Sequence, residues 1–303
     1  PQAYDNAKDF FDTGITWSNS LNVAQMLDKS SYSISLGNTH QDGIISSTGM
    51  DRYNVKVSAD TKLTNNWSSG FTANYITTSI DKAVTSGNGL LRTVYAAPPS
   101  YDLAGIPSHV DGNPYTQNSF RGSFDNAYWA MENNKFTEDT NRFFGNVYAS
   151  YQTDFGTTNH KLNAKYMVGV DAYTTHYVDS YGYGSNTGGG RGQIENYGWT
   201  NATYNSLLTI NYDWHINEDW GLNAVVGNEI IQSNRKKYYE YGTNYNFPGW
   251  NHINNATTQQ TEEETWKNRT VGFFGNVSAS YRNMLYLTLT GRQDYVSNMP
   301  RNN

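Results

Sequence analysis

The 303-residue sequence predicts an all-β fold, namely a portion of a transmembrane antiparallel β-barrel with about ten strands. Three observations predict it: segments that alternate apolar and polar residues with a period of two, short polar turns at one end of the strand pairs, and long loops at the other. A mean hydropathy of −0.73 and the lack of an apolar run of about 18 residues exclude a bundle of transmembrane helices. The 25 Tyr, 12 Phe and 8 Trp exclude a disordered chain, because they carry too much buriable surface.

The alternation is clearest at residues 52–62, where Val55 and Val57 alternate with Lys56 and Ser58. Such segments are typical of half-buried antiparallel strands. The expected strands are residues 15–25, 31–39, 52–62, 69–79, 142–154, 161–175, 204–216, 220–232, 270–282 and 285–296.

The connections between these strands are unequal. Short polar links occur at residues 28–30, 64–66, 217–219 and 282–283. The long segments, rich in Gly, Asn, Tyr and Trp, are residues 80–140, 177–203 and 234–268. Loops of this length are uncommon in compact soluble domains, whereas short turns at one end and long loops at the other are typical of outer-membrane barrels.

The strand lengths fit a membrane. A strand of about 11 residues, tilted by about 40°, rises roughly 28 Å, which crosses the apolar layer of an outer membrane. Trp67 and Trp220 follow short turns and Phe155 precedes one, as in an aromatic girdle at the membrane boundary. The alternative is that these rings cap the core of a soluble sheet.

One segment of sequence recurs, FFGNVYASYQ at 143–152 and FFGNVSASYR at 273–282. Both copies run from a long loop into a short turn. A single recurrence does not indicate a solenoid, so we interpret it as two strands in equivalent environments.

Composition limits the choice of partner and of binding site, but leaves the compartment open. The net charge of −6 and scattered Lys and Arg form no basic stripe, which argues against nucleic acid. The absence of cysteine excludes disulfides and thiolate zinc sites. The polar end at residues 299–303 and the Pro at position 1 lead us to expect that both ends are cuts in a longer protein.

Several segments, taken in order, resemble a known family. They are YDNAKDFFDTG at 4–14, SYSISLG at 31–37, QDGII at 41–45, RYNVKVSAD at 52–60 and MLYLTLTGRQD at 284–294. Their order and spacing are similar to barrel segments of the SusC-like TonB-dependent outer-membrane transporters.

This resemblance implies a 22-stranded barrel in the outer membrane, plugged by an N-terminal domain, covered by a SusD-like surface lipoprotein and energised through TonB. Residues 1–303 are then the middle part of that barrel domain. The sequence departs from the family pattern in having no plug, no TonB box and no C-terminal strand that ends in an aromatic residue. In addition, residues 23–26 (VAQM) replace an expected Gly pair in the first hairpin.

Residues that could carry catalytic or metal chemistry are few. The histidines are scattered and show no metal-ligand spacing: His40, His109, His160, His176, His215 and His252. Glu262 to Glu264 are expected to be a solvated loop face. A loop calcium at Asp111 to Asn113 is a weak alternative to a turn, and the glycine-rich run 188–192 is expected to be a flexible loop tip. We therefore expect no catalytic residue, no metal and no cofactor.

The aromatic residues of the long segments are the candidate ligand site, because flat rings among amides and hydroxyls suit the capture of oligosaccharides or peptides. The alternative is that these rings pack the loops or contact a partner. The candidates are Trp129, Trp250, Tyr183, Trp199 and Tyr245. The residues expected to face the lumen are Lys56, Asp60, Lys165, Asp171 and Glu229.

Three classes of function compete. The first is active import of a bulky nutrient across the outer membrane. The second is a ten-stranded outer-membrane surface enzyme of the protease type, which needs converging acid and base residues at the outer rim. The third is a soluble carbohydrate-binding β-sandwich, which would have shorter strands and more equal loops.

Overall fold

The computed structural model describes residues 2–84 and 89–298. Residues 85–88 of the first predicted long segment lie outside the described residues, and so do Pro1 and the polar end at 299–303.

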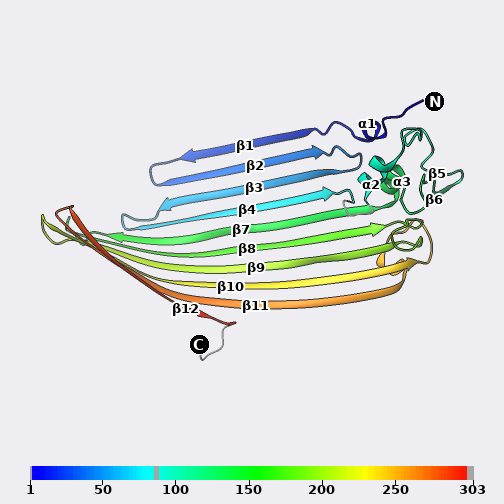
Figure 1. Cartoon of the computed structure of the whole chain (residues 1–303). Helices are drawn as coiled ribbons and strands as arrows, with labels where there is room; N and C mark the ends of the chain where they lie inside the picture. The colour runs from blue at the N-terminus through cyan, green and yellow to red at the C-terminus, as the bar shows by residue number, and fades with distance from the viewer. Residues whose placement is uncertain (1, 85–88, 299–303) are drawn as a thin grey trace.

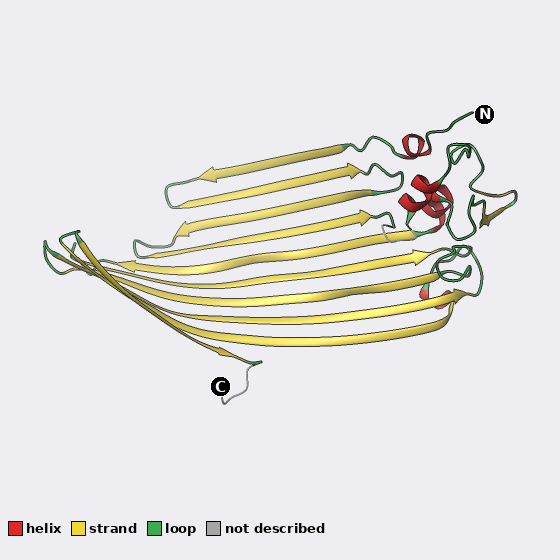
Figure 2. Cartoon of the chain, in the orientation of Figure 1, coloured by secondary structure: helices red, strands yellow, loops and turns green. Residues whose placement is uncertain are grey.

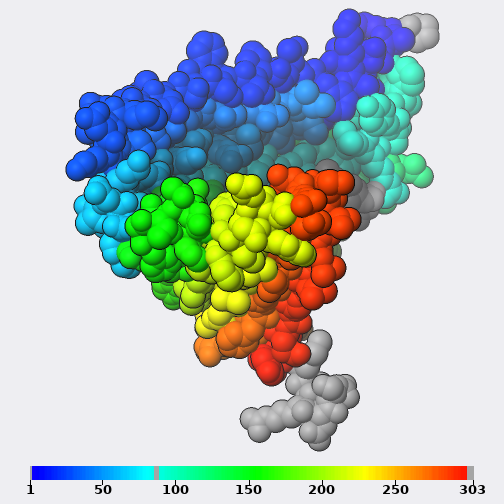
Figure 3. All heavy atoms as spheres, turned by 90° about the vertical axis from the view of Figure 1, so that its left-hand side faces the viewer, coloured from blue at the N-terminus to red at the C-terminus, as the bar shows by residue number. Residues whose placement is uncertain are grey.

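Ten strands form one antiparallel sheet in the order β1-β2-β3-β4-β7-β8-β9-β10-β11-β12 (Figure 1). Seen from the end at which β1 joins β2, the strands follow one another from blue to red along a curved arc (Figure 3). The strands are β1 (Thr16–Met26), β2 (Ser30–Asp42), β3 (Gly49–Lys62), β4 (Trp67–Asp81), β7 (Lys135–Thr153), β8 (His160–Tyr181), β9 (Gln193–His215), β10 (Trp220–Tyr245), β11 (Ala256–Tyr281) and β12 (Leu285–Val296).

All ten predicted strands are confirmed, but several are longer than predicted. β10 and β11 have 26 residues each. The segments 177–203 and 234–268, predicted to be long loops, are therefore mostly strand, and only residues 182–192 and 246–255 connect the strands there.

The prediction failed because the parts of β10 and β11 that were interpreted as loops have no apolar face. In these parts both sides of the β10–β11 pair are polar: Lys236 pairs with Glu263 at 2.8 Å on one side, and Lys237 lies 3.8 Å from Glu264 on the other. Alternation between apolar and polar residues is lost in such a strand. The acidic run that includes Glu262 is likewise a strand rather than a loop.

The register divides the side chains of the sheet between two faces. Residues directly opposite each other in an antiparallel pair share a face, and Val23, Ile34, Val57 and Ala73 form one such row across β1 to β4. The apolar face defined by this row carries the following exposed side chains: Leu21, Val23, Ile34, Leu36, Val55, Phe71, Tyr75, Phe143, Val147, Tyr166, Val168, Leu208, Val226, Phe273, Val277, Leu287 and Leu289. We call the opposite side of the sheet the polar face.

Short turns join the strands at one end, and aromatic pairs follow them on the apolar face. Trp67 packs on Tyr151 with ring centroids 5.0 Å apart, and Trp220 packs on Tyr281 at 4.8 Å. Both tyrosines belong to the recurring ten-residue segment, so the two copies do occupy equivalent positions: each pairs with the tryptophan that opens its neighbouring strand. Phe155 lies in the β7–β8 turn with a φ of 56°.

The other end carries the long connections and the α-helices (Figure 2). These are α1 (Asn6–Phe10), α2 (Leu90–Ala96) and α3 (Ala127–Asn133), with a small hairpin of β5 (His109–Val110) and β6 (Asn113–Gln117) and a 3-10 turn, η1 (Ile253–Asn255). No helix in residues 2–84 and 89–298 is both long and apolar enough to cross a membrane.

The helices enclose the main buried cluster of the described chain. Phe10 of α1 packs with Leu90 and Val94 of α2 and with Trp129 of α3. The segment before β1 is thereby held against the β4–β7 connection.

Candidate functional site

Beyond the apolar face, β8 to β11 continue toward the long-connection end. On β10 and β11 the apolar residues end at Ile230 and Val271, and the next residues on that face are Gln232 and Arg269. The strand length beyond them is where aromatic and charged side chains gather on the polar face.

Three tyrosines form a row across β8, β9 and β10 on the polar face. Tyr177, Tyr197 and Tyr239 are direct cross-strand neighbours. The rings of Tyr177 and Tyr197 stack with centroids 4.8 Å apart and planes 7° apart, and Tyr239 lies 6.3 Å from Tyr197. We call these three residues the tyrosine row.

The hydroxyls of the row stay protonated at neutral pH. Burial, followed by the charge of Glu195, raises the pKa of Tyr239 to about 12. Burial also raises the pKa of Tyr197, whose hydroxyl donates to Asp179 Oδ2 at 3.0 Å. The row thus presents aromatic surface together with hydroxyl oxygens that can accept hydrogen bonds, which suits a ligand that is both polar and bulky.

Arg235 of β10 lies on the same face, two cross-strand rows from Tyr239. Its Cζ is 5.1 Å from the ring of Trp199 and 5.6 Å from the ring of Trp266. Its direct neighbour on β9 is Asn201. An open hollow of about 670 Å³ adjoins Arg235, Asn201 and Trp266.

Hydrogen bonds join the three long connections, which are those between β4 and β7, β8 and β9, and β10 and β11. Asp125 is buried and accepts hydrogen bonds from Gln117 Nε2 (2.8 Å), Ser185 Oγ (2.5 Å), and the backbone N and Nδ2 of Asn186 (2.7 and 2.8 Å). The β10–β11 connection joins them because Asn251 Nδ2 donates to a carbonyl of α3 at 2.9 Å. The connections therefore form one hydrogen-bonded unit.

Two of the predicted ligand-binding residues, Trp129 and Tyr245, are buried in the structure. The side chain of Trp129 is 0% exposed, and its Nε1 donates to Pro114 O at 2.8 Å. Tyr245 is also 0% exposed, in a second buried cluster with Ile194 and Ala256. Neither ring offers a face on which a ligand could stack, because each fills a core at the long-connection end.

The other three predicted residues are more open, and their role in binding stays a prediction. Trp199 lies on the polar face of β9, beside Arg235. Trp250 is 44% exposed in the β10–β11 connection and stacks on His252 at 4.9 Å. Tyr183 packs partly buried against the second cluster.

The register places all five predicted lumen residues on the polar face. They are Lys56, Asp60, Lys165, Asp171 and Glu229. Most of them make polar contacts along the wall.

In the first half of the sheet these contacts join β3, β7 and β8. Tyr148 OH donates to Asp60 Oδ1 at 2.6 Å, and Lys165 Nζ lies 4.2 Å from the centroid of the Tyr148 ring. Arg142 binds Asp171 through two hydrogen bonds, at 2.8 and 2.6 Å.

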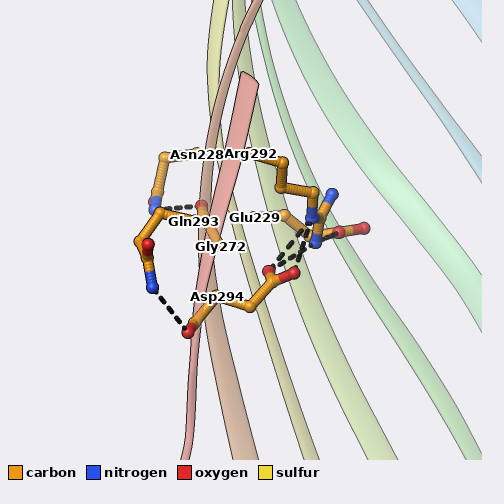
Figure 4. Close-up of polar contacts among 6 residues, drawn as sticks. All are labelled: Asn228, Glu229, Gly272, Arg292, Gln293 and Asp294. Carbon is orange, nitrogen blue, oxygen red and sulfur yellow. Dashed lines mark hydrogen bonds and ion pairs between the residues drawn. The ribbon is translucent and has the colours of Figure 1, made fainter. Parts of the chain in front are cut away.

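Figure 4 shows the corresponding contact in the second half. Arg292 of β12 donates to Glu229 Oε2 at 2.8 Å and to Asp294 Oδ1 at 3.0 Å, on the polar face. Asn228 and Gln293 point to the opposite side of the strands. Adjacent residues thus separate cleanly between the faces.

The tyrosine row, Arg235 and Trp266 were missed by the sequence analysis. All lie in segments interpreted as loops, so their positions on one face could not be read. The pattern that could have found them is the placement of large or charged residues at every second position from Arg235 to Tyr241.

Metal chemistry receives no further support from the arrangement of side chains. Among the residues that the structure describes, no group of three or more His, Asp or Glu side chains is placed to hold a metal ion. Asp111 and Gly112 connect β5 to β6, and Gly112 has a φ of 72°, which is the turn favoured from the sequence.

Comparison with known proteins gives one sequence relative and several structural ones. No family model matches the chain. The chain is similar to the TonB-dependent receptor P3 of Formosa agariphila, at 24% identity, over 100% of this chain and 30% of that protein.

Among solved structures, the RagAB peptide importer in its closed-closed state matches with a TM-score of 0.79 and 17% identity, over 100% of this chain and 34% of that one. The open-open state matches with a TM-score of 0.80 and 15% identity, over 99% and 34%. The chain therefore spans about a third of the length of the structures it matches and has the fold of that part.

Proposed function

We propose that this chain, a section of a SusC-like TonB-dependent transporter, forms part of the wall through which nutrients are imported across the outer membrane. The observation that carries the proposal is the division of one long antiparallel sheet into an apolar face and a polar face. In a barrel, the first contacts lipid and the second lines the interior.

The height of the apolar face supports a place in a membrane. On β11 this face runs from Val271 to Tyr281, which is the length of about 9 to 11 residues expected of a membrane-spanning strand. The pairs of Trp67 with Tyr151 and Trp220 with Tyr281 stand at its lower edge, where an aromatic girdle belongs.

The ligand that we propose is an oligosaccharide or a peptide. It first contacts the polar face, in the part of the strands that extends beyond the apolar face. The tyrosine row supports this assignment because it offers aromatic surface and hydroxyl oxygens that can accept hydrogen bonds from a ligand. The proposed partners are a SusD-like surface lipoprotein over the long connections and the TonB complex, acting through a plug domain.

The two competing classes fit the observations less well. A surface protease would need acid and base residues converging at the rim, and the described residues of the rim, such as Asp125, are used in structural hydrogen bonds. A β-sandwich would pack two sheets face to face, whereas here one sheet carries all ten long strands.

The proposal is tested with the complete gene in its own bacterium. Deletion should abolish growth on the transported nutrient, and the intact gene should restore it. Replacing Tyr177, Tyr197 and Tyr239 together by Ser should weaken ligand binding by about 1 to 2 kcal/mol while the surface level stays normal. The matched control is Tyr238→Ser, the adjacent residue on the other side of β10. Growth of the deletion strain on every nutrient that supports the wild type would refute import as the function.

A further inference from the structure

Arg235 is an exposed cation on the polar face, and no acidic side chain in residues 2–84 and 89–298 pairs with it. Among the described residues its guanidinium makes neither an ion pair nor a hydrogen bond, and its contacts are the rings of Trp199 and Trp266. Two other cations on this face are paired with carboxylates: Arg142 with Asp171 at 2.6 Å and Lys237 with Glu264 at 3.8 Å.

The two tryptophan contacts fix the guanidinium without using its donors. An aromatic ring attracts the flat side of a guanidinium, whereas the N–H groups point outward in the plane of the group. Arg235 therefore lies near both rings, and none of its five donors is engaged by another residue that the structure describes.

A second unused donor lies next to it. Asn201 is the direct neighbour of Arg235 on β9, and its Nδ2 is buried without a hydrogen-bond partner among the described residues. A buried donor without a partner costs free energy, and an arriving acceptor would recover that cost. In the next row, the hydroxyls of Thr203 and Ser233 lie 3.1 Å apart and adjoin the same hollow.

We propose that Arg235 and Asn201 bind a carboxylate of the imported ligand. A guanidinium matches the two oxygens of a carboxylate with parallel hydrogen bonds, and the Asn201 amide supplies a further donor to the same group. Trp199 and Trp266 then contact the apolar or ring part of the ligand beside that carboxylate. This inference rests on the proposed import function, and it narrows the ligand to an acidic one.

Two kinds of nutrient carry such a group: a peptide, at its C-terminus or on an acidic side chain, and an oligosaccharide that contains uronic acid. Binding of four probes to the purified complete protein distinguishes them. The probes are a tripeptide with a free C-terminus, the same tripeptide as its C-terminal amide, a trigalacturonate, and its methyl ester.

The wild-type protein should bind one of the two acids at least about tenfold more tightly than its neutral counterpart, as expected for a hydrogen-bonded charged pair. Arg235→Gln should abolish that preference. Asn201→Asp, which keeps the shape but opposes a carboxylate, should lower the affinity for the acid and leave that for the neutral probe unchanged. Lys237→Gln, on the same face of β10, is the control and should keep the preference.

Equal affinity of the wild type for acid and neutral probes, binding of no probe at all, or an undiminished preference in Arg235→Gln would overturn the site. Heat-modifiability on gels checks that each variant has assembled as a barrel. Uptake is measured separately in cells: a protein that binds the acid with the expected preference but imports neither probe would contradict the import function and leave the carboxylate site standing.

Discussion

A lysine placed on the apolar face at mid-height should be far more damaging than one placed on the adjacent residue. Val147 of β7 is 53% exposed and lies halfway along the apolar stretch from Phe143 to Tyr151. Four residues at about 3.3 Å each, with a tilt of about 40°, put it roughly 10 Å from either edge of that stretch. We therefore expect Val147→Lys to cost about 2 to 4 kcal/mol, the range for a cation near the bilayer midplane.

Two substitutions in the same strand serve as references. Asn146→Lys puts the charge on the polar face, among groups such as the Tyr148 hydroxyl, and should be nearly neutral. Tyr151→Lys puts it at the lower edge of the apolar face, where the cost should fall to about 0 to 1 kcal/mol for the charge itself.

The measurement is urea-induced unfolding of the complete protein in lipid vesicles, followed by heat-modifiability on gels. The expected order of destabilisation is Val147→Lys, then Tyr151→Lys, then Asn146→Lys. Equal losses for Val147→Lys and Asn146→Lys would refute the assignment of the two faces to lipid and interior.

Three further predictions concern the connections. In a complete protein whose only cysteine is the one introduced, a cysteine at Gly189 should react with a membrane-impermeant reagent on intact cells and one at Asn65 only after permeabilisation, and the reverse pattern would invert the orientation. Trp129→Ala removes a fully buried ring and should destabilise the helical cluster by about 3 to 5 kcal/mol, seen as faster proteolysis of the β4–β7 connection; cleavage at the wild-type rate would contradict a core role. Asp125→Ala leaves buried donors such as Ser185 Oγ unpaired at about 1 to 3 kcal/mol each, so hydrogen exchange should rise in both connections it joins, and a rise in only one would show that they are not coupled.

The strands inside the apolar band could be predicted because each has one face that must be apolar. Val55 and Val57 between Lys56 and Ser58 show that constraint directly, and the same holds for most of the ten strands. The position of the predicted lumen residues on the polar face followed from the same alternation, since a strand that presents Val57 to one side must present Lys56 to the other.

The remainder could not be predicted, because no such constraint acts beyond the apolar face. Both sides of β10 and β11 are polar there, so Arg235 and Tyr239 carried no periodic pattern against an apolar background. The burial of Trp129 depends on contacts with α1 and α2, which are distant in the sequence, and no local pattern distinguishes it from the exposed Trp250.

The unequal strand lengths give the wall a slanted rim. β10 and β11 have 26 residues whereas β1 has 11, and at about 3.3 Å per residue with a tilt of about 40° the longer strands stand roughly 38 Å higher. In the transporter proposed above, a molecule diffusing toward the opening would meet the longer strands before the shorter ones. After this first contact the molecule would diffuse in two dimensions along the protein surface instead of in three dimensions through solution. Arg235 and the tyrosine row lie on that surface.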